Sequence, residues 1–525
     1  MLRSVFVMLA LSAMQVVFAQ TCDNLCLQQT TCANPATDTM ISGTVYMPNG
    51  TVPLPNALVY VPNAAVQPFT PGVGCKTCTT PSGSPLVAAV TDASGRFLLH
   101  NAPVGPNIPL VIQVGRWRRQ ILVPSVSACA TTLVAAPLTK LPPTHSVGDI
   151  PLIGFVTGSA DTEECLLRKI GLLDSEFGNA GGAARINLFQ GAVSPGAKID
   201  ASTLSEDTLE NSAATLNKYD AVIMGCQGSS YIPVTAAQDN FVAFVNAGGR
   251  ALLFHKANSF LVNDAAYTSL ATWIAGGGST NPPNQTGYID TSSLKASTLA
   301  EWLTLMSPTT MLGQVPLTQL RQDYTTVSDP AINWVNLQDA TLGTVPVQFS
   351  FNQPTAAAPG ARCGRVAFVD YHSNVGNTGT STFPAECVTG AMTPQELAAA
   401  YTLFDTTNCV QADTFPTLSA TRLAGNRQAV TPGQVYSTLL RVQLTNADGT
   451  HPQGYPVTFT AVASSQGANG SFSSAIDQVT SYDGVAIAPF LTSNTTVGTF
   501  TVTTNVGATF TLYVGDDVIF SDNFE

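Results

Sequence analysis

Charged side chains are scarce in this chain of 525 residues, at 10% of the composition, and most of them are acidic. The 33 acidic and 21 basic residues give a net charge of -12. The densest basic run is Arg116-Trp117-Arg118-Arg119. A nucleic-acid-binding protein concentrates cations on one face, so this composition predicts no nucleic-acid partner.

Long apolar runs are absent after the first twenty residues, which read MLRSVFVMLALSAMQVVFAQ. No later run reaches the ~18–20 residues that a membrane-spanning helix needs, so no membrane span is predicted. In the first twenty, Arg3 precedes an apolar run that ends at Ala19, which is typical of a secretory signal peptide. Residues 1–19 are therefore predicted to be removed, and the mature protein is predicted to be secreted. Gln20 and Thr21 before Cys22 argue against a lipid anchor.

Motifs of common enzymes and cofactor sites are also missing. The chain has no Gly-x-Ser-x-Gly, no HExxH, no phosphate loop and no dinucleotide fingerprint. The sequence therefore predicts no cofactor and no metal.

All 11 cysteines follow the predicted signal, in a compartment that permits disulfides. An odd number leaves at least one cysteine unpaired or paired with another chain. Cys75 and Cys78 have the CxxC spacing of zinc sites and redox dithiols. Because no second CxxC and no suitably spaced histidine accompany them, they are predicted to form loop disulfides, with Cys129 as a candidate partner.

Two further cysteine pairs follow from the expected elements. Cys165 lies on a helix after the first central strand and Cys226 follows a neighbouring strand, so these two are a candidate pair. Cys387 and Cys409 flank one predicted helix and are a second candidate pair.

The length suggests about three domains, and 42 Gly and 34 Pro favour short strands joined by turns. After a Cys-rich leader (20–39), residues 40–140 show four or more alternating strand patterns and predict a β-sandwich. Its residues resemble the carboxypeptidase regulatory-like domain, which implies a transthyretin-like sandwich without catalytic residues. The resemblance rests on Gly43, Val45, Pro53, Pro55, Ala57, Val59, Thr91, Asp92, Gly95, Phe97, Leu99, Pro103 and Gly105.

After a linker (141–149), strands alternate with helices over residues 150–412, which predicts a parallel sheet covered by helices on both faces. The expected strands include 150–157, 185–189, 219–224 and 250–254, and the expected helices include 162–173, 236–247 and 394–404. The segment resembles the ThuA-like group of the class I glutamine amidotransferase-like fold, a flavodoxin-like α/β architecture. The carriers are Tyr219-Asp220, the helix end at 246–250, His255, and the strand Gly364–Asp370 that closes on His372.

Residues 413–514 return to alternating strands with turns at Asp448-Gly449 and Asp483-Gly484. They resemble a bacterial Ig-like domain of the invasin or adhesin type, carried by residues 456–459, 484–486 and 498–503. Residues 515–525 are expected to form a short tail. Residues 40–410 together also resemble a group of secreted bacterial proteins that join the first two modules, on the signatures at 116–119, 165–170 and 383–409.

Candidate site residues follow three predicted strands of the central domain. Ligands of open parallel sheets bind at the carboxyl ends of the strands, where Cys226, His255, Asp370 and His372 are expected. A histidine beside a carboxylate can act as a general base, and two histidines with a carboxylate can bind a metal. Against a catalytic role, the turn at which an amidotransferase-like enzyme places its cysteine holds His255 here.

The favoured interpretation is that His255 bonds to loop backbone and that Cys226 is oxidised. Asp161, Glu163 and Glu164 are interpreted as acids at a helix N-terminus, and Trp117 as strand packing beside a cation–π neighbour. The sequence thus predicts a secreted or cell-surface, non-catalytic protein that binds a polysaccharide or a surface protein. The alternative is a secreted hydrolase or carbohydrate-modifying enzyme that uses His255, Asp370 and His372. A free thiolate at Cys226 beside either histidine would contradict the prediction of a non-catalytic central domain.

Overall fold

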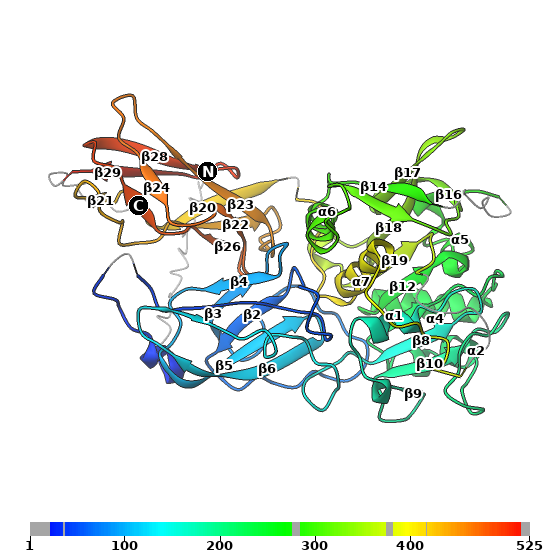
Figure 1. The fold of residues 1–525 in the computed structure, drawn as a ribbon. Coiled ribbons are helices and arrows are strands. Elements are labelled where there is room, and N and C mark those ends of the chain that lie inside the picture. Colours follow the sequence, from blue (N-terminus) through cyan, green and yellow to red (C-terminus); the bar gives the residue numbers. More distant parts are fainter. Residues whose placement is uncertain (1–21, 35–36, 276–283, 374–381, 416, 516–525) are drawn as a thin grey trace, which may run out of the picture.

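The computed structural model describes residues 22–34, 37–275, 284–373, 382–415 and 417–515. The predicted signal peptide, residues 1–19, and residues 516–525 of the predicted tail lie outside this part of the chain. The protein is mostly sheet with few helices, and its strands gather in three units (Figure 1). We call them the N-terminal β unit (β1–β7), the central unit (β8–β19) and the C-terminal β unit (β20–β29).

The N-terminal β unit consists of two sheets, with strand orders β4-β1-β7 and β3-β2-β5-β6. Strand β4 shows why the chain folds this way, since Phe97 and Leu99 point inward and Arg96 and Leu98 point to solvent. A short 3-10 helix, η1 (Asn24–Gln28), precedes the strands. Their bounds are β1 Met40–Thr44, β2 Leu58–Pro62, β3 Pro85–Val90, β4 Arg96–Leu99, β5 Gly105–Val114, β6 Trp117–Val126 and β7 Thr131–Leu133.

The central unit contains a sheet of ten strands in the order β15-β14-β17-β18-β19-β12-β11-β8-β10-β9. The six strands from β19 to β9 are parallel, as predicted, but β18, β17, β14 and β15 are antiparallel. The sheet is therefore mixed, because four antiparallel strands extend the parallel half. The central strands are β8 Ile153–Thr157, β9 Phe177–Asn179, β10 Ile186–Gln190, β11 Ala221–Met224, β12 Arg250–Phe254, β13 Ala271–Trp273, β14 Gln285–Ile289, β15 Gln314–Leu317, β16 Tyr324–Val327, β17 Ile332–Asp339, β18 Gly343–Gln353 and β19 Gly364–Val369.

Helices cover both faces of the parallel half, so alternate strand residues enter two different cores. In β12, Leu252 and Phe254 belong to the core that contains α1, α6 and α7, while Ala251 and Leu253 belong to the core that contains α4 and α5. The helices are α1 Glu164–Lys169, α2 Glu206–Glu210, α3 Ala213–Leu216, α4 Thr235–Asn246, α5 Ser259–Val262, α6 Leu294–Met306 and α7 Pro394–Thr407, with 3-10 turns η2 Asp174–Glu176, η3 His255–Asn258, η4 Thr268–Leu270 and η5 Pro359–Ala361.

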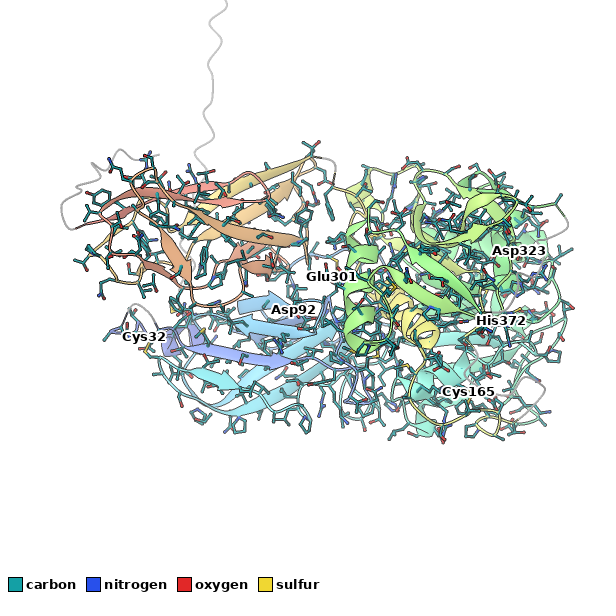
Figure 2. The ribbon with its side chains drawn as sticks, turned by 45° about the horizontal axis from the view of Figure 1, so that its top comes forward. Cys32, Asp92, Cys165, Glu301, Asp323 and His372 are labelled. Atoms are coloured by element: carbon teal, nitrogen blue, oxygen red, sulfur yellow. A yellow bond between two sulfur atoms is a disulfide. The ribbon has the colours of Figure 1, made fainter. Side chains whose placement is uncertain are left out.

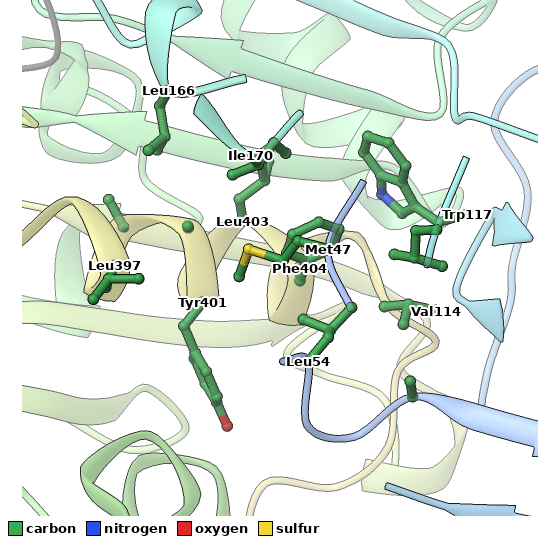
Figure 3. Packing of buried hydrophobic residues seen from close by; sticks show 14 of the residues in the cluster. Met47, Leu54, Val114, Trp117, Leu166, Ile170, Leu397, Tyr401, Leu403 and Phe404 are labelled. Carbon is green, nitrogen blue, oxygen red and sulfur yellow. The ribbon is translucent and has the colours of Figure 1, made fainter. Parts of the chain in front are cut away.

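One apolar core joins the N-terminal β unit to the central unit. Figure 3 shows Met47 and Trp117 of the N-terminal unit against Phe404 of α7, and the Trp117 and Phe404 ring centroids are 5.4 Å apart. The indole Nε1 of Trp117 donates to Thr407 Oγ1 at 3.1 Å. Trp117 therefore packs as predicted, but against a helix of the neighbouring unit.

The C-terminal β unit also has two main sheets, ordered β20-β22-β26 and β21-β29-β28-β23-β25, around a core of its own. A two-stranded sheet of β24 and β27 accompanies them. The strands are β20 Leu418–Ala424, β21 Ala429–Val430, β22 Arg441–Asn446, β23 Pro456–Val462, β24 Gly470–Phe472, β25 Asp477–Val479, β26 Val485–Ile487, β27 Leu491–Ser493, β28 Gly498–Thr504 and β29 Thr509–Val514.

Ten cysteines form five disulfides, and Cys226 is free. The five disulfides fit an extracellular protein, because disulfides persist in oxidising compartments. Two of them bind the N-terminal β unit to the central unit. The pairs are Cys22–Cys26, Cys32–Cys129, Cys75–Cys363, Cys78–Cys409 and Cys165–Cys387.

The predicted pairings were wrong. Cys387 and Cys409 lie beyond opposite ends of α7, whose 14 residues span about 21 Å, whereas a disulfide needs Cα atoms about 5–6 Å apart. Cys129 instead pairs with the leader through Cys32, and the loop with Cys75 and Cys78 crosses to the central unit. Cys226, the expected partner of Cys165, lies at the sheet edge beside a histidine.

A buried ion cluster connects β19, α6 and α7 to the segment that leads into the C-terminal β unit. Arg365 is 0% exposed, and its guanidinium lies 2.7 Å from Asp405 and 2.9 Å from Asp413. Lys295 lies 2.9 Å from the same Asp405 carboxylate. The predicted border between residues 412 and 413 thus runs through an ion cluster.

Within the described ranges, no helix is both long and apolar enough to cross a membrane.

Candidate functional site

Three adjacent parallel strands deliver the predicted site residues to one edge of the central sheet. Cys226 follows β11 by two residues, His255 follows β12 directly, and His372 comes three residues after β19. Because β12 pairs with both β11 and β19, these segments are neighbours. Figure 2 shows His372 and Asp323 on the side of the central unit that faces away from the N-terminal β unit. We call Cys226, His255 and His372 the rim cluster.

His255 occupies a strained turn. Its φ is 45°, a left-handed value, at the point where β12 ends and η3 begins. A non-glycine residue in this conformation costs on the order of 1–3 kcal/mol and persists only where the surrounding structure enforces it. The strand-to-helix turn expected from the sequence is therefore present, with an imidazole at its apex.

The imidazole contacts side chains, and not loop backbone as the sequence suggested. His255 Nδ1 lies 2.9 Å from Cys226 Sγ and 3.0 Å from His372 Nε2. Cys226 is 0% exposed and His255 is 4% exposed. The favoured interpretation is corrected here, because it required an oxidised Cys226 and a backbone-bonded His255.

Burial determines the protonation states of the Cys226 thiol and the His255 imidazole. Burial raises the pKa of the Cys226 thiol to about 11, and the backbone N–H groups of Lys256 and Gly228 offset this only in part. Burial, followed by the charges of His372 and Arg321, lowers the pKa of His255 to about 2. A cysteine hydrolase uses a thiolate beside an imidazolium, whereas both groups are neutral here. In this geometry the sulfur is free but not activated.

Carboxylates surround the rim cluster. Asp370 lies beside Asp323, whose backbone N–H donates to Asp370 Oδ2 at 2.8 Å. Asp323 Oδ2 is 3.9 Å from His255 Nε2, and Asp161 Oδ2 is 4.0 Å from His372 Nδ1. Asp323 was missed by the sequence analysis, because it precedes the short strand β16 and belongs to no motif. Burial, followed by the charge of Asp323, raises the pKa of Asp370 well above its ordinary range.

The acids after β8 lie at or just before the N-terminus of α1, as interpreted, with Glu163 at the N-cap, but they are buried. Asp161, Glu163 and Glu164 are all buried, and only Glu164 lies in the first turn of α1. Burial raises the pKa of Glu163 and of Glu164 well above the ordinary range. No sequence pattern indicated this burial, since the helix dipole favours acids at a helix N-terminus whether or not they are exposed.

Glu206 of α2 is expected to make the free energy of unfolding depend measurably on pH. Burial raises its pKa from the ordinary 4.5 to about 7, although Gln227 Nε2 donates to its carboxylate at 2.9 Å. The folded chain therefore binds more protons than the unfolded chain between these values, so the free energy of unfolding falls as pH rises from 4.5 through 7. The expected contribution is roughly 3 kcal/mol.

Replacing Glu206→Gln should remove this contribution, and urea unfolding from pH 4 to pH 8 measures it. The variant should gain stability over the wild type as pH rises. Asp239→Asn, on the exposed side of α4, is the matched control and should follow the wild type. Parallel curves for Glu206→Gln and the wild type would contradict the prediction.

A second candidate site lies at the opposite edge of the central sheet. A cavity of ≈ 360 Å³ lies where the loop between β2 and β3, the β5–β6 turn, the strand starts of β11 and β12, and the end of α7 meet. Gln453 of the C-terminal β unit also lines it. Its volume is within the range of about 300–1,000 Å³ that small-molecule sites show.

The cavity wall carries more positive than negative charge. Its cations are Lys76, Arg116, Arg118 and Arg250, and its one carboxylate, Asp220, pairs with Arg116 at 2.8 Å. Arg250 donates only to backbone carbonyls, those of Gly248, Cys363, Asn408 and Lys76. Burial, followed by the charges of Arg365 and Arg116, lowers the pKa of Arg250 to about 9.

Arg118 and Gln113 retain hydrogen-bonding capacity toward this space. Arg118 is 6% exposed and its Nε donates to Asp149, but within the described residues its two terminal nitrogens have no partner. The guanidinium lies over the ring of Phe69 at 4.0 Å. The buried Oε1 of Gln113 accepts no hydrogen bond from the described part of the chain. From the sequence, the basic run at 116–119 was interpreted only through the packing of Trp117, and Cys75 and Cys78 only as loop disulfides.

Comparison with known proteins gives weak similarities only. No protein-family model matches the chain, and no curated protein matches it. A solved structure described as ThuA-like, from Bacteroides uniformis, is 12% identical over 48% of this chain and 89% of its own, with a TM-score of 0.26. A second one, from Parabacteroides merdae, is 13% identical over 50% of this chain and 92% of its own, with a TM-score of 0.27. The β-galactosidase from Bacillus circulans is 9% identical over 65% of this chain and 41% of its own, with a TM-score of 0.28. Scores this low transfer no residue role.

Proposed function

We propose that the protein is a secreted, non-catalytic binding protein that holds a small anionic, hydroxyl-bearing ligand of the sugar-acid class in the cavity between its units. Arg118 carries the proposal, because it is 6% exposed, lines the cavity, and its two terminal nitrogens have no partner among the described residues. Two parallel N–H groups of a guanidinium match a carboxylate or a sulfate. Phe69 covers the flat face of this guanidinium and leaves its edge for the anion.

The remaining lining selects a ligand that also carries hydroxyl groups. Gln113 Oε1 accepts no hydrogen bond from the described residues, so it needs a donor, and a ligand hydroxyl supplies one. Threonine hydroxyls at 70, 77, 79 and 80 line the same space. The apolar part of the wall, with Leu58, Phe69 and Pro81, suits the C–H face of a sugar ring. A sugar acid combines all three features.

The disulfides favour a preformed site. Cys78 and Cys409, which are bonded to each other, both line the cavity, and Cys75–Cys363 holds the same loop. The two bridges hold the walls of this space covalently, which supports a binding role. A preformed site loses little free energy to ordering when a ligand binds.

A hydrolase at the rim cluster is the second candidate, favoured by the convergence of Cys226, His255 and His372. It is the weaker one, because the thiol and the imidazole are both neutral. A cavity beside the cluster, lined by Gly225, Gln227 and Lys256 among others, has only ≈ 10 Å³, too little for one sugar ring. Release of a chromophore from nitrophenyl glycosides or nitrophenyl acetate, lost in His255→Ala, would favour this candidate.

The architecture proposed with this function keeps the resemblances found in the sequence. We infer a carboxypeptidase regulatory-like sandwich for residues 40–140, a ThuA-like domain for 150–412 and a bacterial Ig-like domain for 413–514. The paired sheets of each β unit and the parallel half of the central sheet support this inference. Secretion after cleavage behind Ala19 belongs to the same proposal.

Isothermal titration calorimetry with glucuronate, glucose 6-sulfate and glucose tests the binding function. Either anion should bind and glucose should bind at least tenfold more weakly, and the preferred anion distinguishes a carboxylate ligand from a sulfate ligand. Arg118→Gln should weaken binding about 10- to 100-fold, since hydrogen bonds to charged groups contribute about 1.5–3 kcal/mol. Gln113→Leu should weaken it without changing the charge.

Arg119→Gln is the matched control, because Arg119 is the next residue of β6 and donates to the Lys140 carbonyl outside the cavity lining. It should bind like the wild type. Equal affinity for glucose and the anions, unchanged affinity in Arg118→Gln, or no heat with any ligand at millimolar concentration would each contradict the proposal.

A further inference from the structure

The three side chains of the rim cluster bring one electron-pair donor each close together. Cys226 Sγ, His255 Nδ1 and His372 Nε2 all lie within 4.8 Å of one another. The two contacts to His255 Nδ1 are 2.9 and 3.0 Å long. Each donor stands at the end of a different strand of the parallel half, so the backbone positions are fixed by the sheet.

Hydrogen bonds alone do not satisfy this arrangement. A neutral imidazole nitrogen carries either one proton or one lone pair, so His255 Nδ1 can bond well to the thiol or to His372, but not to both. Either way, the two short contacts must share the single proton or the single lone pair of Nδ1. A cation among the three atoms would bond to two imidazole lone pairs and one thiolate at once.

The second ring nitrogen of each histidine is also placed as in metal-binding histidines. His255 Nε2 and His372 Nδ1 are buried and have no hydrogen-bond acceptor among the described residues. Each nonetheless faces a buried carboxylate, Asp323 Oδ2 at 3.9 Å and Asp161 Oδ2 at 4.0 Å. Metal-binding histidines usually donate their second N–H to a carboxylate, which fixes the tautomer and orients the ring.

We propose that Cys226, His255 and His372 bind one Zn²⁺ ion through Sγ, Nδ1 and Nε2. One thiolate and two imidazoles suit zinc, which takes sulfur at about 2.3 Å and nitrogen at about 2.0–2.1 Å in tetrahedral sites. The thiol loses its proton to solvent when the ion binds. Three protein ligands leave a fourth position for water or another small donor. Asp323 and Asp161 act as positioning residues for the two imidazoles.

This site is independent of the cavity proposed for binding, because the two lie at opposite edges of the central sheet. The CxxC pair weighed as a zinc motif in the sequence is excluded from it, since Cys75 and Cys78 are both in disulfides. A fourth ligand position would also allow hydrolytic chemistry, but the zinc proposal does not require it.

Cobalt spectroscopy and metal analysis of the full-length protein test the proposal. The wild type, prepared without chelator, should contain about one zinc per chain. After zinc removal, Co²⁺ should give the intense charge-transfer absorption of a cobalt–thiolate bond and the visible bands of a tetrahedral site. Cys226→Ser should keep weak visible bands and lose the charge-transfer band.

His372→Ala is the sharper variant, since the His372 side chain is 14% exposed and its loss disturbs the core least. It should weaken zinc binding at least 100-fold in a competition titration with a chromophoric chelator. Asp161→Asn should weaken it about 10- to 100-fold, as expected for a group that orients a ligand. His145→Ala, which removes a half-exposed histidine paired with Glu176, is the control and should bind like the wild type.

Three results would overturn the proposal. The first is less than a tenth of a zinc per chain together with no cobalt–thiolate absorption in the wild type. The second is unchanged affinity in His372→Ala with a wild-type melting temperature. The third is a cobalt spectrum that Cys226→Ser does not alter.

Discussion

Removing both bridges between the N-terminal β unit and the central unit is expected to destabilise the protein by more than the sum of the two single removals. Cys75–Cys363 and Cys78–Cys409 close loops of 288 and 331 residues, each worth about 5–6 kcal/mol in the chain-entropy account. While one bridge remains, the long loop stays closed and the second bridge closes a far shorter one. Each single removal should therefore cost about 2–4 kcal/mol.

Urea unfolding followed by tryptophan fluorescence measures this effect in paired serine variants, so that no odd thiol is created. The variants are Cys75→Ser with Cys363→Ser, Cys78→Ser with Cys409→Ser, and all four together. Cys22→Ser with Cys26→Ser is the control, because that bridge has a sequence separation of 4 and should cost little. A fourfold variant that loses only the sum of the two pairs, or less, would show that the bridges act independently.

Replacing Arg365→Met is expected to lower the free energy of unfolding by about 3–5 kcal/mol. Arg365 is 0% exposed, and its loss leaves the carboxylates of Asp405 and Asp413 buried with only Lys295 nearby. Breaking a buried ion pair from one side is costly, because an uncompensated charge stays behind. Ser350 and Asn352 also lose the guanidinium donor.

Differential scanning calorimetry and urea unfolding measure the loss. Arg168→Met is the matched control, since its pair with Asp174 is partly exposed and should contribute at most about 1 kcal/mol. Arg365→Met combined with Asp413→Leu should recover part of the stability, because the buried Asp413 carboxylate, which has lost its Arg365 partner, is also removed. An Arg365→Met variant within about 1 kcal/mol of the wild type would contradict a structural role for the cluster.

Local patterns were sufficient to predict many elements of the fold. β12 was predicted to the residue, since residues 250–254 are a run of strand-forming residues that follows a pair of glycines. α4 lies within one residue of its prediction because Gly248 and Gly249 end its apolar period. The helix expected over 162–173 is only Glu164–Lys169, because Gly171 turns the chain at φ 110°.

Long-range packing decided what the sequence could not predict. The ends of the parallel strands were expected to meet at one edge of the sheet, and they do. Which strands are neighbours was not predicted, and it is the pairing of β11 with β12 that places Cys226 beside His255. The disulfide partners depend on which surfaces of two units meet, and no local spacing encodes that. Arg118 was read as part of a strand, because the cavity that it lines forms only when three units assemble.

The Cys78–Cys409 bridge also determines how the molecule would bear a pulling force. A load applied between the two ends of the described chain would pass from one sulfur to the other and bypass the 331 residues between them. These residues, which would span roughly 1,100 Å if fully extended, would therefore not be stretched. The central sheet and the groups at both of its edges would stay folded under a tension that unravels the C-terminal β unit.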